Sequence, residues 1–317
     1  MNDTKNTSND KKIVFLFFLI PSIMLIIGYF IRPFPPIEIA EKLIQIPIFL
    51  GLSLLGIGFF WREKNTGRKI KIAGWIVFAF YWSTMPMYLY LVEMGDIFNA
   101  VVCIIGVYVL IYVAYNEWLS LKGYDDVSCL NWMAGATFIA GMIYFLIESE
   151  LIFPSLKKFL IEMVAVQTSG FLNILGIKAH VEGITVFYQE IPITIIFACT
   201  AIQAMTLFLG MIGALCRADW KRKIEALLVT ILPMYFLNIV RTSSVVYLVG
   251  GNITSFEIAH NLLSKIGALV TLIVLLLITF KILPELYEEI ICLIDIPKRN
   301  GPIERSFKKY LGRKKEA

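Results

Sequence analysis

Long apolar runs recur along the whole chain, and they limit the possible folds more than any other feature of the sequence. Each run has about 18 residues or more, which is enough for a helix to cross a bilayer core of ~30 Å. Of the 317 residues, 58% are hydrophobic and only 17% are charged, so disorder is excluded and an ordinary soluble domain is disfavoured. A β-barrel would show short alternating segments instead. We therefore predict an all-α polytopic membrane protein.

The apolar runs predict a single transmembrane domain at 13–290 with about eight helices. The first run lacks a small-residue cleavage site and ends at Arg32 and Pro33, so we expect a retained helix rather than a signal peptide. The expected spans are 13–31, 44–61, 72–92, 97–115, 130–147, 198–216, 224–249 and 266–285.

The distribution of basic residues predicts how the chain is oriented in the cell membrane. Lysines and arginines crowd the loops after the second and sixth spans and the C-terminal tail, whereas the loops 93–96 and 250–264 have none. The positive-inside rule then places both termini in the cytoplasm, with 1–12 as a short N-terminus and 291–317 as a basic tail. We interpret the tail as a solvated segment that touches anionic lipid. The net charge of +5 arises from these inner segments and predicts no nucleic-acid partner.

The longest external segment, 148–197, is expected to carry structure of its own. Residues 151–174 have the apolar spacing of an amphipathic helix that lies on the membrane surface. Residues 177–190 are rich in β-prone side chains around a turn at Glu182 and Gly183, which indicates a short β-hairpin. This segment leads directly into the sixth expected span.

The chain has five cysteines, an odd number, and none lies in a Cys-x-x-Cys motif. This pattern argues against a disulfide framework and against a structural zinc site. We expect no metal and no cofactor.

Cys199 lies at the expected outer end of the sixth span. A lone membrane cysteine is usually a small hydrophobe. Here, however, a helix would begin, and that end of a helix favours negative charge by about a few tenths to one kcal/mol. A thiolate is the nucleophilic form of cysteine. Thr200 and Gln203 follow at once and are candidate supporting residues.

Arg241 is physically the most unusual residue, because it lies inside an apolar run. An arginine in a bilayer costs roughly 2.5 kcal/mol or more, so such residues usually face a bundle interior and have a function. Asn238 and Ser244, three residues away on either side, are expected to share its helix face. The alternatives are snorkelling or a structural ion pair, but no carboxylate lies deep in an expected span.

Two histidines compete for the role of a general base. His260 lies in the external approach to the eighth span, and His180 lies in the expected hairpin. We favour His260 because it should sit at the top of a helix, although a surface-loop histidine is the plain alternative. Histidine can activate a cysteine near neutral pH, and an arginine can stabilise an oxyanion, so the three residue types together indicate a cysteine peptidase or transpeptidase.

These residues resemble the signature of a known family. Ala-Cys-Thr-Ala-Ile at 198–202, Asn-Ile-Val-Arg at 238–241 and His260 before the last span look like the motifs of the exosortase/archaeosortase family. The resemblance covers roughly 130–285 and implies that Cys199, Arg241 and His260 are the catalytic residues. The compact form, without the additional C-terminal domain that bacterial members often carry, looks more like the archaeal branch.

The resemblance implies a function at the outer membrane face. Such enzymes are thought to cleave secreted proteins that end in a short motif, a transmembrane helix and a basic tail, and to transfer the new C-terminus to a lipid or another acceptor. The rival hypothesis is a transporter or channel in which Arg241, Asn238 and Ser244 line an anion path. Matched repeat halves would support that rival, and none is visible.

Overall fold

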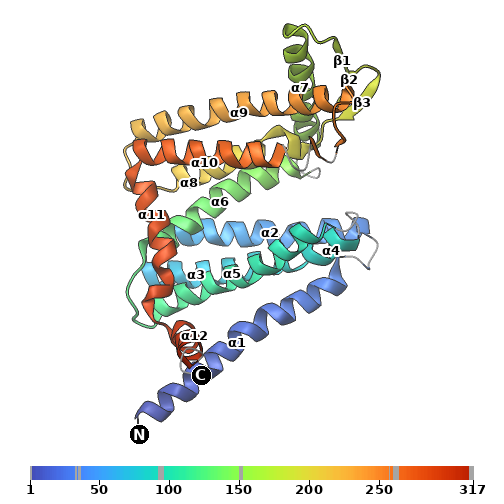
Figure 1. Ribbon diagram of the computed structural model, residues 1–317. Helices are drawn as coiled ribbons and strands as arrows, with labels where there is room; N and C mark the ends of the chain where they lie inside the picture. The colour runs from blue at the N-terminus through green and yellow to red at the C-terminus, as the bar shows by residue number, and fades with distance from the viewer. Residues whose placement is uncertain are drawn as a thin grey trace. The chain divides into compact units, whose positions relative to one another are not determined.

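The structure is a computed structural model that describes residues 2–32, 34, 37–91, 96–149, 153–256, 258–259 and 264–313. The described chain divides into two compact units, residues 1–138 with 289–317 and residues 139–288. The first unit contains α1 Asn2–Ile31, α2 Ile37–Phe60, α3 Lys64–Ser83, α4 Met85–Leu91, α5 Ile97–Leu121, the start of α6 Ser128–Glu148, the end of α11 Pro284–Asp295, the 3-10 turn η3 Ile296–Arg299 and α12 Pro302–Arg313 (Figure 1). The second contains the rest of α6 and α11, α7 Pro154–Ile174, β1 Ala179–Glu182, β2 Thr185–Tyr188, β3 Ile191–Thr194, the 3-10 turn η1 Phe197–Thr200, α8 Ile202–Gly213, α9 Trp220–Gly250 and α10 Ser264–Ile282.

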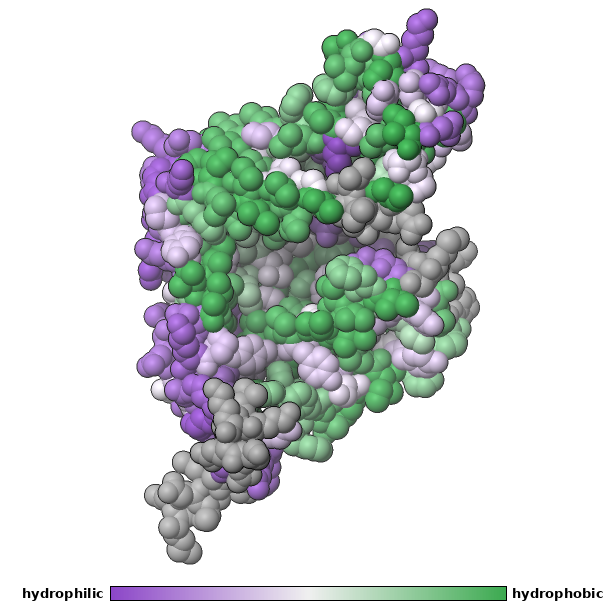
Figure 2. Space-filling view, in the orientation of Figure 1, coloured by the Kyte–Doolittle hydropathy of each residue, from purple (hydrophilic) through white to green (hydrophobic). Residues whose placement is uncertain are grey.

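The predicted fold class is confirmed, and the expected number of about eight spans is approximate. Among the described residues six helices are long and apolar enough to cross a membrane, and a bent pair, 266–282 with 284–299, would make a seventh. Pro284 accounts for the bend, because it lacks an N–H and disfavours helical backbone at the residue before it. Large apolar side chains of α10 such as Leu269 and Leu277 are exposed, and Figure 2 shows apolar side chains along the long helices and polar ones at their ends. Such surfaces suit contact with lipid.

Close helix contacts build the first unit. A Cβ added to Gly51 would lie 2.9 Å from the backbone nitrogen of Phe78, and one added to Gly74 would lie 3.0 Å from Leu55. Small residues therefore let α2 and α3 approach closely, as is common between membrane helices. Leu55 and Trp75 are fully enclosed at this contact.

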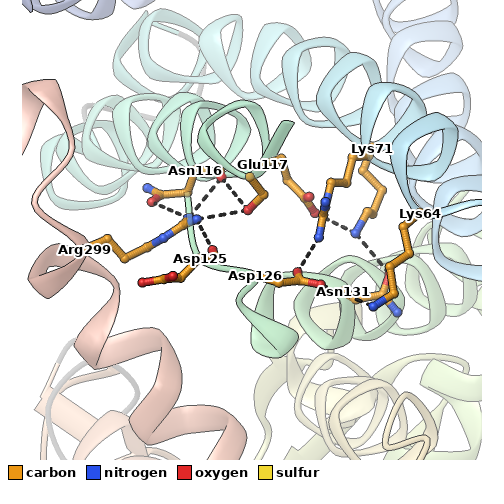
Figure 3. A network of polar contacts seen from close by, with 10 residues as sticks. Lys64, Lys71, Asn116, Glu117, Asp125, Asp126, Asn131 and Arg299 are labelled. Carbon is orange, nitrogen blue, oxygen red and sulfur yellow. Dashed lines mark hydrogen bonds and ion pairs between the residues drawn. The ribbon is translucent and has the colours of Figure 1, made fainter. Parts of the chain in front are cut away.

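Figure 3 shows a polar network that joins α3, α5, α6 and η3, and its centre is a buried ion pair. The Nζ of Lys71 lies 2.7 Å from Oε1 of Glu117 and donates to Oδ1 of Asn131 at 3.0 Å. The side chains of Lys71 and Glu117 are only 5% and 1% exposed, so each charge depends on the other. The sequence did not suggest this pair, because Lys71 was counted with a basic loop and Glu117 fell just outside an expected span.

In the described part of the C-terminal segment, η3 and α12 pack against other helices of the first unit, whereas we expected 291–317 to be a solvated tail. The guanidinium of Arg299 donates to the carbonyl of Asn116 at 3.1 Å and to the hydroxyl of Ser120 at 3.0 Å. On α12, Glu304 is buried, and Arg305 pairs with Asp10 of α1 at 2.9 Å. These contacts attach η3 and α12 to α5 and α1.

The second unit carries the structured segment expected between the fifth and sixth spans. In Figure 1, α7 and the three strands gather at the C-terminal end of α9. Helix α7 corresponds to the amphipathic helix predicted at 151–174, of which 151 and 152 lie outside the described residues. The predicted hairpin is present as β1 and β2, and residues 191–194 add a third antiparallel strand in the order β1-β2-β3. The inner face of the sheet, with Val186 and Ile193, packs against α7 and against Val246 of α9.

Candidate functional site

The chain passes from β3 into Cys199 through a short turn. Ile195 donates its N–H to the carbonyl of Ile184 at 2.8 Å and so extends the pairing of β3 by one residue. The 3-10 turn η1 then begins, and within it Cys199 donates its N–H to Ile196 at 2.8 Å. Cys199 is thus held between the end of a strand and the start of α8.

The sixth span, which we expected to be continuous over 198–216, is interrupted directly after Cys199. Ala201 adopts the left-handed conformation, with φ 58°, and α8 starts at Ile202. Because α8 has 12 residues, it extends only about 18 Å at ~1.5 Å per residue and is shorter than a bilayer core. Thr200 supports the interruption, because its hydroxyl donates to the carbonyl of Phe197 at 2.7 Å and accepts from the N–H of Ile202 at 3.4 Å.

Cys199 is buried in an apolar cluster and is held by a residue of α9. Its side chain is in the free thiol form, and the residue is only 6% exposed among aliphatic side chains of α7, the sheet and α9. The Nδ2 of Asn238 donates to the carbonyl oxygen of Cys199 at 2.8 Å. Asn238 itself is 5% exposed, so this hydrogen bond is shielded from solvent. A predicted supporting residue therefore contacts the predicted nucleophile, 39 positions away in the sequence.

Arg241 follows Asn238, which binds the Cys199 carbonyl, by three residues on α9. Arg241 is partly buried, and its Nε is enclosed without a hydrogen-bond partner among the described residues. No carboxylate in that part of the chain forms an ion pair with it. Arg241 thus carries a buried donor on a permanent cation, on the same helix as the residue that binds Cys199, and such a donor can stabilise a negative charge that develops nearby.

The other predicted supporting residues do not all reach this site. Gln203 is exposed in the first turn of α8. Ser244 is also exposed, and its hydroxyl donates to the carbonyl of Val240 within α9 at 2.8 Å. The polar stripe that we expected around Arg241 therefore includes Asn238 but not Ser244.

The structure describes one of the two candidate general bases, His180, but not the other, His260. His180 lies on β1, is exposed, and stacks on Phe187 with ring centroids 4.8 Å apart. Because β2 separates β1 from β3, His180 is on the side of the sheet away from the strand that leads to Cys199. His260 lies outside the described residues, so its position relative to the thiol stays a prediction.

The remaining cysteines contain one pairing that we did not expect. Cys129 and Cys292 form a disulfide with their Cα atoms 5.9 Å apart, whereas Cys103 and Cys216 are free. The sequence could not suggest this bond, because its partners lie 163 positions apart. The ligand atoms of these two cysteines and Glu289 lie within 4.8 Å of one another. Only thiolate sulfurs bind metals well, so this cluster suits a metal only when the disulfide is reduced.

The fold and the site together define a helical membrane protein in which one helix, α9, carries a partly buried arginine and the asparagine that binds the backbone of a buried cysteine. Residues 44–280, well over half of the chain, match the family described as Transmembrane exosortase (Exosortase_EpsH). The chain belongs to this exosortase/archaeosortase family, as the motifs around Cys199 and Arg241 indicated.

Two curated relatives are archaeosortases from haloarchaea. Archaeosortase A of Haloferax volcanii is 26% identical over 64% of this chain and 70% of its own length. Archaeosortase A of Natronomonas pharaonis is 25% identical over 61% of this chain and 62% of its own length. No solved structure matches the chain.

Proposed function

We propose that this protein is a membrane-embedded cysteine transpeptidase or protease. Its substrates are secreted proteins that end in a short motif, a transmembrane helix and a basic tail. The enzyme cleaves this C-terminal sorting signal at the outer face of the cell membrane and transfers the new C-terminus to a lipid or another acceptor. Family membership and the archaeosortase relatives support this type of activity.

The observation that carries the proposal is the joint placement of Cys199 and Arg241 by α9. Asn238 holds the backbone of Cys199, and Arg241, three residues further along the same helix, has an enclosed Nε without a hydrogen-bond partner among the described residues. A cysteine that served only for packing would need no charged neighbour in an apolar region, because a buried charge costs free energy. The free-energy cost of burying Arg241 in this apolar region is offset if the guanidinium binds an anion that forms during the reaction.

The proposed reaction has two steps. His260 takes the proton of Cys199, and the sulfur attacks the carbonyl carbon of the scissile peptide bond. Arg241 stabilises the oxyanion, the C–N bond breaks, and His260 returns the proton to the leaving amine. The resulting thioester is attacked by a nucleophile of the acceptor, which restores the Cys199 thiol. Water in place of the acceptor would give simple proteolysis.

Replacement of single cysteines tests this proposal. A tagged secreted protein with a C-terminal apolar helix and basic tail is coexpressed with the enzyme, and its processing is followed by mobility and by the mass of its new C-terminus. Cys199→Ala and Cys199→Ser should abolish processing. Cys103→Ala and Cys216→Ala replace the two other free cysteines and should leave processing intact.

A chemical trap tests the intermediate. Hydroxylamine attacks thioesters, so adding it to membranes that contain the wild-type enzyme should yield a substrate that ends in a hydroxamate. Full processing by Cys199→Ala would refute the enzyme and would favour the anion-path alternative for Arg241.

A further inference from the structure

The two outer edges of the small sheet differ in how their backbone groups are satisfied. On the outer side of β1, the N–H of Ala179 donates to Oδ1 of Asn173 at 3.0 Å, and Nδ2 of Asn173 donates back to the carbonyl of Ala179 at 2.9 Å. The hydroxyl of Ser169 donates to the same carbonyl at 3.0 Å. Side chains of α7 therefore replace a neighbouring strand at this edge.

The opposite edge, on β3, directs its own backbone groups outward. Paired residues in an antiparallel ladder alternate between hydrogen-bonded and non-hydrogen-bonded pairs. Ile195 bonds to Ile184, so the next pair, Thr194 with Thr185, is of the non-hydrogen-bonded kind. The N–H and C=O of Thr194 thus point away from β2, as does the C=O of Pro192 two residues earlier. Proline fits such a position because it has no N–H to donate.

The outer side of β3 has no neighbouring strand in the described part of the chain. The side chains of Pro192 and Thr194 are exposed. One N–H and two C=O groups are therefore arranged in a row. An edge of this kind is a template for pairing with another extended chain.

We propose that the outer edge of β3 binds the substrate segment that precedes the scissile bond, as an added parallel strand. This inference rests on the function proposed above. Cys199 follows Thr194 by five residues, a distance of at most about 17 Å in an extended chain. A peptide that pairs with Thr194 therefore reaches Cys199 within a few residues. Strand addition is a common way to bind extended peptides, because the main chain supplies the hydrogen bonds.

The parallel direction follows from the order of segments in the two chains. In the enzyme, the extended strand β3 comes first, Cys199 second and the apolar helix α8 third. In the proposed substrate, the motif comes first, the scissile bond second and the transmembrane helix third. A parallel strand brings corresponding segments together, whereas an antiparallel strand would direct the substrate helix back along the sheet.

Two substitutions of Thr194 distinguish the contribution of its backbone N–H from that of its side chain. Thr194→Pro removes the outward N–H, and the natural Pro192 shows that this edge accepts proline. Thr194→Ala removes the side chain but keeps the N–H. We expect Thr194→Pro to process the tagged substrate about tenfold more slowly than Thr194→Ala, as befits one lost hydrogen bond. Equal rates for the two variants would overturn the inference.

Disulfide cross-linking tests the direction without depending on activity. Thr194→Cys or Pro192→Cys is placed in a Cys199→Ala enzyme, and single cysteines are scanned along the substrate before its scissile bond. Thr194→Cys should form a disulfide with substrate cysteines at every second position scanned. Pro192→Cys should shift the pattern by two residues, away from the scissile bond. No cross-links, or a shift toward the scissile bond, would contradict the parallel strand.

The two proposals fail in different ways. An active Cys199→Ala enzyme would refute the proposed function. An inactive Cys199→Ala enzyme, combined with equal processing by the two Thr194 variants, would refute only the role of β3.

Discussion

The hydrogen bond from Asn238 to Cys199 gives the sharpest test of how the site is held together. Leucine has nearly the shape of asparagine, so Asn238→Leu keeps the packing and removes the 2.8 Å donor. The carbonyl of Cys199 is then left unsatisfied in a buried place, which costs about 1–3 kcal/mol. At roughly 2–4 °C per kcal/mol, the melting temperature of the detergent-purified protein should fall by about 2–12 °C.

Activity should suffer more than stability, because Asn238 positions the residue that attacks the substrate. A misplacement of ~1 Å at a reacting group can lower the rate by about 100-fold. We expect kcat for the tagged substrate to fall by about 100-fold, and KM to change little, at a temperature well below the melting temperature. Ser244→Ala is the matched control, since Ser244 lies on the same helix, is exposed and bonds only within α9. Wild-type kcat and melting temperature in Asn238→Leu would refute the positioning role.

Two further predictions concern the ion pair of Lys71 with Glu117 and the interrupted sixth span. Glu117→Gln should lower the free energy of unfolding by about 3–5 kcal/mol, because Lys71 loses its partner. The double variant Glu117→Leu with Lys71→Met should recover most of that loss, and thermal unfolding measures both effects. Ala201→Gly should raise the free energy of unfolding by about 1 kcal/mol, because glycine adopts the left-handed conformation without the penalty that alanine incurs. A melting temperature for Ala201→Gly below that of the wild type would contradict this explanation.

The sequence was most informative where polarity conflicts with an apolar environment. Arg241 stood out because hydrophobic runs exclude charge, and helical spacing then placed Asn238 on the same face of the same helix. In the structure, Asn238 donates to the carbonyl of Cys199. Helical spacing alone was less reliable for Ser244, three residues beyond Arg241, because it cannot say how far the enclosed part of a helix face extends.

The sequence was least informative where the tertiary structure overrides local preference. Alanine is the strongest helix former, so nothing at Ala201 indicated that the sixth span is interrupted there. Similarly, Ile191-Pro-Ile-Thr forms a strand because β2 lies beside it, although proline is disfavoured inside a strand. The disulfide between Cys129 and Cys292 and the ion pair of Lys71 with Glu117 join distant segments whose spacing has no recognisable pattern.

The interruption at Ala201 explains how Cys199 is held. A continuous helix through Cys199 would use the Cys199 carbonyl for a bond within the helix, so the carbonyl would not depend on a donor from α9. Breaking the helix leaves that carbonyl for Asn238, and the short turn η1 joins Cys199 to the end of β3. The strain at Ala201 is of the kind that persists only when surrounding contacts enforce it, and such residues cluster at functional sites. The break at Ala201 thereby accounts for the hold on Cys199 by α9, and the strand edge that we assign to the substrate ends five residues before that cysteine.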